Sequence, residues 1–237
     1  ARIHMTSKSQ AMAPAPPSAL LLVLAMFQTA STAGIIYGWP ALVRVFINEG
    51  QYSELCNEDQ NVTRHTGHAT TERNGCPLQI VELNWAFTLA CAASFVGQYP
   101  MGLVFDRFGP RVCLVLAFAG CTVGLTLLSL FDSRTFPAGL SAGLTFAGFF
   151  GPAIQMGNLH VTNLFAARNR NKAASCITSS FSVSFFVFQA VKLLHDHAAF
   201  RLQTLLTALA VMAGVNTVVS LLVWPGAAFR PAADDVD

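Results

Sequence analysis

The sequence carries little charge. Only 11% of its 237 residues are Asp, Glu, Lys or Arg, less than half of the roughly 25% found in soluble globular domains. The net charge of +2 is small and the basic residues are scattered between apolar stretches, so nothing favours a nucleic-acid partner. With 53% hydrophobic residues, the composition is typical of an integral membrane protein.

The chain also lacks the patterns that carry catalysis or hold metals. It has no Ser, His and Asp in the order of a nucleophilic triad, no glycine-rich phosphate loop and no paired acids within an apolar run. His195 and His197 lie in a short turn without a third ligand nearby, so a zinc site is not expected. Lys192 and Asp196 instead predict an ion pair at a helix end, because they are four residues apart. We therefore expect no enzyme activity, no metal site and no cofactor.

Six apolar runs are long enough to cross a membrane, which takes about 20 helical residues for ~30 Å of hydrocarbon. They cover residues 18–45, 80–105, 112–131, 136–161, 173–194 and 202–224. Lys and Arg are concentrated on the side of the two chain ends, which the positive-inside rule assigns to the cytoplasm. The predicted fold is an all-α membrane protein, with a cytoplasmic tail over 1–17, a six-helix domain over 18–225 and the start of a cytoplasmic linker over 226–237.

The long connection over 47–79 lies outside in this topology, where thiols are oxidised. Cys56 and Cys76 are its only cysteines, so we expect them to form a disulfide. Asn61 begins a glycosylation sequon in the same loop. Because so short a pattern often occurs by chance, glycosylation of Asn61 and a chance match are equally favoured. An outer loop that can form a disulfide suits the oxidising exterior of the cell, which favours the plasma membrane as the location.

Polar residues gather in two of the runs. The first run holds Gln28, Thr29, Ser31, Thr32 and Gly34 near the expected bilayer centre, and the fifth holds Ser175, Ser179, Ser182 and Gln189 at helical spacing. Lipid offers such groups no partners, so each patch either binds a solute or bonds to neighbouring helices. Gly34 would let the first helix loosen and offer backbone groups to a solute. The candidate solute-binding residues are Gln28, Ser31, Thr32, Gly34, Ser179 and Ser182.

No Asp, Glu, Lys or Arg lies in the middle third of any apolar run. Coupled transporters usually keep an intramembrane carboxylate, because a buried ionisable group is costly and is retained for a purpose. The pattern therefore favours facilitated, uncoupled movement of a polar or zwitterionic solute. In the fourth run, Gln155 and Asn158 share a face and indicate a gate or a helix contact.

Residues 102–111, between the second and third runs, read Gly-Leu-Val-Phe-Asp-Arg-Phe-Gly-Pro-Arg. A tight turn explains the glycines and the proline, but it does not require an Asp beside an Arg. The spacing resembles the signature G-x-x-x-D-R-x-G-x-R of the major facilitator superfamily. Every fixed position is filled, by Gly102, Asp106, Arg107, Gly109 and Arg111.

Further strings resemble solute carrier family 43, the facilitative system-L transporters of large neutral amino acids, and the similar transporters of apicomplexan parasites. They are Tyr37-Gly38-Trp39, Asn48-Glu49-Gly50, the paired loop cysteines, and Asp-Arg-Phe-Gly-Pro-Arg at 106–111. The resemblance implies the N-terminal half of a twelve-helix carrier, built from two three-helix inverted repeats and working by alternating access. The signature residues would gate its cytoplasmic side. The implied partners are a small-molecule solute, the lipid bilayer and a C-terminal six-helix domain.

Two alternatives accompany this interpretation. One branch of family 43 resembles the chain and moves purines, which makes a purine nucleobase carrier the alternative within transport. From a different class, a half-length chain would be a non-transporting membrane subunit. The complete signature argues against the subunit, because a structural bundle has no use for a charged latch. Where the family tends to have an acid early in its first helix, this chain has Gln28.

Overall fold

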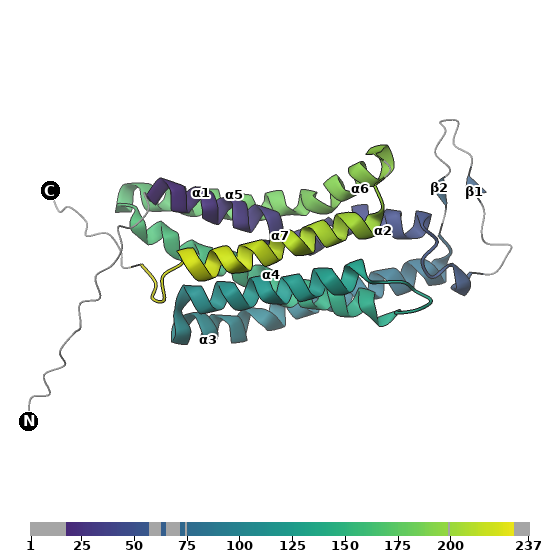
Figure 1. Cartoon of the computed structure of the whole chain (residues 1–237), viewed down its shortest axis with the longest axis horizontal. Coiled ribbons are helices and arrows are strands. Elements are labelled where there is room, and N and C mark those ends of the chain that lie inside the picture. Colours follow the sequence, from purple (N-terminus) through teal and green to yellow (C-terminus); the bar gives the residue numbers. More distant parts are fainter. Residues whose placement is uncertain (1–17, 57–62, 65–71, 74, 199, 230–237) are drawn as a thin grey trace, which may run out of the picture.

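The computed structural model describes residues 18–56, 63–64, 72–73, 75–198 and 200–229. Its helices run side by side along one long axis, and two short strands lie at one end (Figure 1). These strands, β1 Thr63–Arg64 and β2 Glu72–Arg73, pair antiparallel. Apart from this hairpin the ordered elements of the described chain are helices, as predicted. We call the end with the strands the disulfide end, and the end with residues 102–111 the signature end.

The first apolar run is a broken helix. It comprises α1 Ser18–Gln28, η1 Thr29–Ala33, η2 Ile35–Gly38 and α2 Trp39–Asn48. Gly34 interrupts it with φ −121° and ψ 20°, and the two parts meet at 50°. A Cβ at Gly34 would lie 2.5 Å from Ser184 Oγ, so the break also packs closely on the helix opposite. The helix is thus interrupted at the residue where the sequence predicted loosening.

The 53-residue element α3, Pro77–Ser129, is a helical hairpin and not one rod. Gly109 has φ 82° and ψ 176°, and the chain reverses there, because Cys113 Sγ lies 3.7 Å from the main-chain oxygen of Met101. A straight helix of this length would extend ~80 Å, far beyond ~30 Å of hydrocarbon. The second and third apolar runs form the two arms of this hairpin.

The remaining helices complete the bundle. They are η3 Ser53–Leu55, α4 Ala138–Leu159, η5 His160–Leu164, α5 Ala167–Val183, η6 Ser184–Phe186, α6 Val187–Ala198 and α7 Leu202–Val223. Three of the described helices are long and apolar enough to cross a membrane: Pro77–Ser129, Ala167–Ala198 and Leu202–Val223. The broken first helix brings the number to four. The count of six spans stays a prediction.

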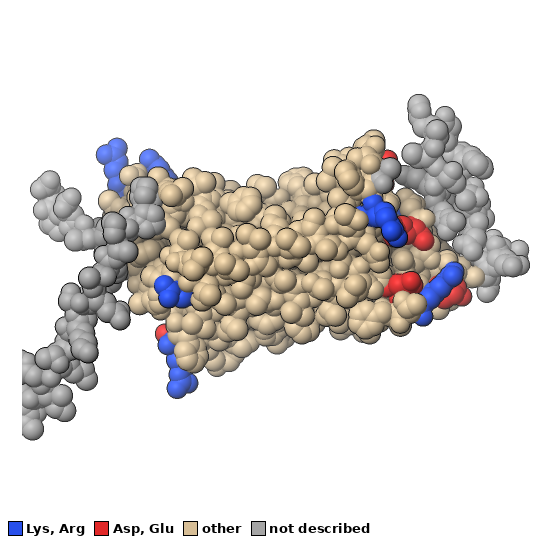
Figure 2. All heavy atoms as spheres, in the orientation of Figure 1, with Lys and Arg blue, Asp and Glu red and all other residues tan. Residues whose placement is uncertain are grey.

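On the face drawn in Figure 2, the surface of the bundle is uncharged along its middle. Figure 2 shows Lys, Arg, Asp and Glu at the two ends of the long axis, with a broad belt free of them between. Large apolar side chains are exposed on the helices; Phe95 and Leu222 are 73% and 74% exposed. Water would disfavour such a surface, whereas lipid would solvate it. The fold therefore has the surface of a membrane protein.

Small residues let the helices approach closely. Gly124 of α3 and Gly143 of α4 face each other, and a Cβ on either would lie 2.7 Å from the main-chain oxygen of the other. Backbone contacts of this kind hold helices together in lipid, where apolar burial offers little advantage. Larger side chains fill the space toward the two ends, with Trp39 and Phe46 in one cluster and Trp224 in the other.

Candidate functional site

The signature turn, residues 102–111, joins the two arms of α3. Its Gly109 has a positive φ that residues with side chains rarely adopt, and a Cβ there would collide with the main-chain oxygen of Gly226. Arg111 Nε donates a hydrogen bond of 2.5 Å to the main-chain oxygen of Trp224. The chain that follows α7 therefore fixes the turn.

Residues 224–229, which we call the exit segment, make two further contacts at the signature end. Asn163 Nδ2 donates a hydrogen bond of 3.0 Å to the main-chain oxygen of Phe229. The rings of His160 and Phe229 are stacked, with centroids 5.0 Å apart and an interplanar angle of 14°. Both partners come from η5, so the exit segment joins the signature turn to the end of α4.

The charged pair of the signature turn is exposed. Neither Asp106 nor Arg107 forms an ion pair with another described residue. A Cβ at Gly102 would have no described atom within 4 Å, apart from atoms of its chain neighbours and of the backbone of its own helix turn. This face of the turn is therefore uncovered, in contrast to the face that holds Gly109.

Gln28, a candidate solute-binding residue, lies between helices and is fully buried. Its Nε2 donates a hydrogen bond of 3.1 Å to Ser220 Oγ, and its Oε1 accepts one of 3.1 Å from Trp224 Nε1. Both the amide nitrogen and the amide oxygen of Gln28 are thus hydrogen-bonded, to Ser220 of α7 and to Trp224, which follows α7. This geometry favours helix packing over solute binding for Gln28.

The neighbours of Gln28 are also buried. Ser31 Oγ donates to the main-chain oxygen of Gln28 at 3.1 Å and lies 3.2 Å from Thr32 Oγ1. Asn158 of α4 donates to Thr29 Oγ1 at 3.1 Å, which favours the helix-contact interpretation of Asn158. The first polar patch is therefore largely satisfied within the bundle.

The polar stripe on α5 has the opposite character. Ser175, Thr178, Ser179 and Ser182 are all exposed, and a shallow hollow of about 470 Å³ lies over the first three. Ser180, on the other side of the helix, is buried and donates to the main-chain oxygen of Cys176 at 2.9 Å. The structure thus separates Ser179 and Ser182 from the buried patch of the first helix.

A cavity of about 420 Å³ lies where η2, α3, α4 and α5 meet. Tyr37, Gln98 and Gln155 contribute its polar groups, and Phe181 of α5 closes it against Tyr37 at a ring-centroid distance of 6.1 Å. Sequence reasoning found Gln155 but assigned no site role to Tyr37 or Gln98. The available signal for Gln98 was a lone amide within a long apolar run.

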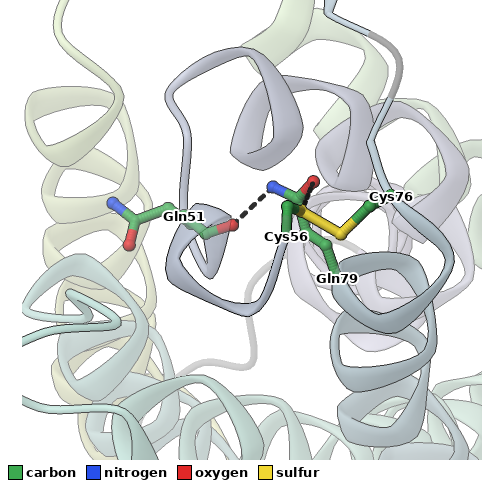
Figure 3. The surroundings of a disulfide bond; sticks show 4 residues. All are labelled: Gln51, Cys56, Cys76 and Gln79. Carbon is green, nitrogen blue, oxygen red and sulfur yellow. Dashed lines mark hydrogen bonds between the residues drawn. A yellow bond between two sulfur atoms is a disulfide. The ribbon is translucent and has the colours of Figure 1, made fainter. Parts of the chain in front are cut away.

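The predicted disulfide is present between Cys56 and Cys76, whose Cα atoms are 5.8 Å apart. Figure 3 shows the surrounding contact, in which Gln79 Nε2 donates a hydrogen bond of 2.6 Å to the main-chain oxygen of Gln51. The bond ties the start of α3 to the chain that follows α2. The glycosylation candidate Asn61 lies outside the described residues, as do the predicted tail 1–17 and the linker beyond residue 229.

The predicted ion pair at the end of α6 is also present, with Lys192 Nζ 3.4 Å from Asp196 Oδ2. Within the described ranges, no group of three or more His, Cys, Asp or Glu residues is arranged to hold a metal ion. The polar groups around the 420 Å³ cavity are hydroxyls and amides, which bind polar solutes by hydrogen bonds.

A helical bundle with charged ends, an uncharged middle, a broken first helix and an open polar face is typical of a multi-pass membrane protein of the transporter class. The Major Facilitator Superfamily profile matches residues 21–234. The chain belongs to this superfamily.

Within this superfamily, the chain is similar to several characterised or named proteins. The chain is 27% identical to the human "Large neutral amino acids transporter small subunit 3", over 83% of this chain and 32% of the relative. It is 30% identical to "Protein FMP42" of Saccharomyces cerevisiae (70% and 31%) and 29% identical to the bovine "Equilibrative nucleobase transporter 1" (74% and 35%). The chain thus spans about a third of the length of these relatives.

Proposed function

We propose that the chain is the N-terminal six-helix half of a carrier for large neutral amino acids, working by uncoupled facilitated diffusion. The observation that carries this proposal is the open polar face of α5, with Ser179 and Ser182 exposed in a part of the bundle that holds no charge. A serine-rich face is poorly solvated by lipid. It suits a water-filled path that a second domain completes.

Six crossings are consistent with the helical segments. In this proposal the broken first helix would provide one crossing, the two arms of α3 two, and α4, the stretch Ala167–Ala198 and α7 three. Two three-helix repeats would then be related by inversion, as in other carriers with repeated halves. Basic residues at the signature end support a cytoplasmic location for that end; they are Arg107, Arg111, Arg168, Arg170 and Lys172.

The path is proposed to run between the α5 face and the 420 Å³ cavity beside Tyr37. Phe181 contributes to this cavity from α5, and the break at Gly34 lies on the same helix as Tyr37. Of the candidates on the first helix, Ser31, Thr32 and Gly34 would shape the path through the break, while Gln28 holds α1 against α7. Without an acid in the middle of the bundle, the solute would move down its own gradient.

The signature turn would close the cytoplasmic side. Gly102, Asp106 and Arg107 form its uncovered face, and a carboxylate there would be stabilised by the positive N-terminal end of a helix from the second domain. Gly109 and Arg111 hold the turn from the other side. A plasma-membrane location and glycosylation at Asn61 accompany this proposal, because both place the loop 47–79 outside the cell.

A purine nucleobase is the second candidate solute. The similarity to the bovine nucleobase transporter favours it, and so do the aromatic rings of Tyr37 and Phe181 beside the 420 Å³ cavity, since aromatic side chains stack on bases. A non-transporting subunit is the remaining alternative. It would leave the open faces of α5 and of the signature turn without a role in transport.

Uptake by the full-length protein in proteoliposomes tests these functions. We expect uptake of labelled leucine that persists when a protonophore abolishes the proton gradient. Replacement of Asp106 by Asn together with Arg107 by Gln should reduce this uptake at least tenfold, whereas Arg168→Gln, another exposed arginine at the signature end, should not. Competition by adenine and not by leucine would select the nucleobase carrier. Absence of uptake of either solute would support the subunit.

A further inference from the structure

A separate cavity lies at the disulfide end, away from the α5 face and the signature turn. Its volume is about 490 Å³, within the ~300–1,000 Å³ of small-molecule sites. The end of α2, the α3–α4 connection and the α6–α7 connection surround it. Its lining combines polar and charged side chains with apolar ones, of which Phe200 is half exposed and Phe46 and Phe131 are almost fully buried. We call it the end cavity.

Side chains of opposite charge line the end cavity, at an end where both signs gather (Figure 2). Among the described residues, Arg201 has no carboxylate within 4 Å, and Glu49 approaches only the His195 ring. Asp132 uses its Oδ1 to accept the main-chain N–H of Arg134 at 2.9 Å. The cavity therefore offers a guanidinium and two carboxylates that are not joined by an ion pair of 4 Å or less.

When the His195 ring is neutral, it and Glu49 face each other with acceptor atoms only. His195 Nδ1 lies 2.9 Å from the main-chain oxygen of Phe200, and a carbonyl only accepts, so Nδ1 carries the proton. When the ring is neutral, its Nε2 is an acceptor, and it lies 3.9 Å from Glu49 Oε1. Two acceptors so placed are both satisfied by an ammonium group.

The environment of Glu49 favours a bound cation. Burial raises the pKa of this carboxyl, while Arg201, and His195 when its ring is protonated, act in the opposite direction. Burial is the larger effect, so the surroundings of Glu49 disfavour its ionised form. An ammonium group in contact with the carboxylate would restore that stabilisation.

The other side of the end cavity suits a carboxylate. Arg201 is the N-cap of α7, and its side chain does not cap the helix. The N–H groups of Leu202 and Gln203, both lining the cavity, belong to the first turn, which has no intrahelical acceptor. A guanidinium beside a helix N-terminus is a favourable site for an anionic group.

We propose that the end cavity binds a zwitterion with an apolar side chain, of which a neutral α-amino acid is the natural class. The ammonium group contacts Glu49 and His195 Nε2, the carboxylate contacts Arg201 and the first turn of α7, and the side chain packs against the apolar part of the lining at Phe200. Its net charge of zero matches a site that holds both signs. The proposal depends on the proposed function only for leucine as the probe, and the site is distinct from the proposed path.

Protection from labelling tests the site without transport. Gln203→Cys in the full-length protein in nanodiscs, with the exposed free Cys176 replaced by serine, provides a reactive thiol at the rim of the cavity. We expect L-leucine to slow its reaction with a charged maleimide, and 4-methylpentanoate and isopentylamine, which each lack one charge, to be at least tenfold weaker as protectants. Equal protection by 4-methylpentanoate would overturn the proposal in favour of a simple anion site.

Substitutions of the charged residues give the second readout. In the Gln203→Cys background, Glu49→Gln and Arg201→Gln should each weaken leucine protection about tenfold or more, since each removes a charge-assisted hydrogen bond. Arg134→Gln is the matched control, because Arg134 is an exposed arginine at the same end that does not line the cavity. Protection that is unchanged in both test variants would refute the site.

The two proposals fail separately. Leucine uptake without protection of Cys at position 203 would refute the end-cavity site and leave the carrier function intact. Protection by leucine together with adenine-selective uptake would support the site and refute the proposed solute of the carrier. Native-like thermal unfolding of each variant shows that a loss of protection does not come from misfolding.

Discussion

Arg111 and Trp224, which are 113 residues apart in the sequence, are joined by a hydrogen bond from the guanidinium Nε to the main-chain oxygen. The contact brings the last fixed residue of the superfamily signature onto the first residue of the exit segment. Its neighbour Gly109 packs against Gly226. The side of the signature turn with Gly109 and Arg111 thus packs against residues of this chain. The side with Asp106 remains accessible to another domain or protein.

Replacing Gly109 by Ala should destabilise the protein. Gly109 has φ 82° and ψ 176°, a backbone conformation that costs a residue with a Cβ about 1–3 kcal/mol, and the collision with Gly226 adds to this cost. Thermal unfolding of purified protein in detergent measures the effect. Gly102→Ala is the control, because its Cβ meets no described atom and Ala favours a helix by roughly 0.5–1 kcal/mol. Equal unfolding temperatures for the two variants would contradict the structure.

Replacing Gln28 by Leu should lower stability and leave solute affinity unchanged. The change removes hydrogen bonds to Ser220 and Trp224 and leaves buried partners unsatisfied, at about 1–3 kcal/mol. Thermal unfolding and the KM for leucine uptake by the full-length protein separate the two effects. A raised KM at native stability would instead identify Gln28 as a solute ligand.

Replacing Ser179 by Leu should have the reverse outcome. Ser179 is exposed over the hollow on α5, so the fold does not require it, whereas a bulky apolar group would obstruct a polar path. We expect KM for leucine to rise several-fold with an unchanged unfolding temperature. Ser180→Ala is the matched control, because Ser180 is the adjacent serine that faces inward. An unaffected KM for Ser179→Leu would argue against the proposed path.

Removal of the disulfide between Cys56 and Cys76 should destabilise the disulfide end. For a sequence separation of 20 residues, the loss of loop-closure entropy in the unfolded chain corresponds to about 3 kcal/mol. Thermal unfolding of Cys56→Ser should match that of the double variant that also carries Cys76→Ser. A much lower stability of the single variant would mean that the remaining thiol forms other bonds.

Glu49 should make stability depend on pH. Burial raises the pKa of its carboxyl above the ordinary 4.5, so its contribution to stability is fully present below that value and is lost as the pH rises through the raised pKa. Glu49→Gln has no such loss. The unfolding temperature of the variant relative to the native protein should therefore increase between pH 4 and pH 7. Glu54→Gln is the control, because Glu54 is a nearby acid that does not line the end cavity; a flat difference for Glu49→Gln would contradict the prediction.

Local features of this fold were predictable from the sequence. The reversal at Gly109, the disulfide between Cys56 and Cys76, and the ion pair between Lys192 and Asp196 all follow from spacing within a short stretch. Apolar runs predicted the helices because lipid leaves the backbone few alternatives. The boundary between the two arms of α3 was predicted as a connection of residues 106–111, and the helical conformation continues almost without interruption around Gly109.

Contacts between distant helices were not predictable. The sequence pattern of the polar patch at residues 28–34 is the same whether the patch faces a solute path or a neighbouring helix. Only the folded structure shows that Ser220 contacts Gln28. The amide of Gln98 and the hydroxyl of Tyr37 were overlooked for a related reason, because single polar residues carry no periodicity. Their shared cavity forms from elements that are far apart in the chain.

The exit segment has a mechanical consequence. Gly226, Trp224 and Phe229 are anchored to the signature turn and to η5, so any tilt of that turn displaces the chain leading out of the bundle by a similar amount. A domain attached beyond residue 229 would therefore move together with the signature turn. The stiffness of the exit segment would determine how closely the movements of this domain and of the helical bundle are coupled.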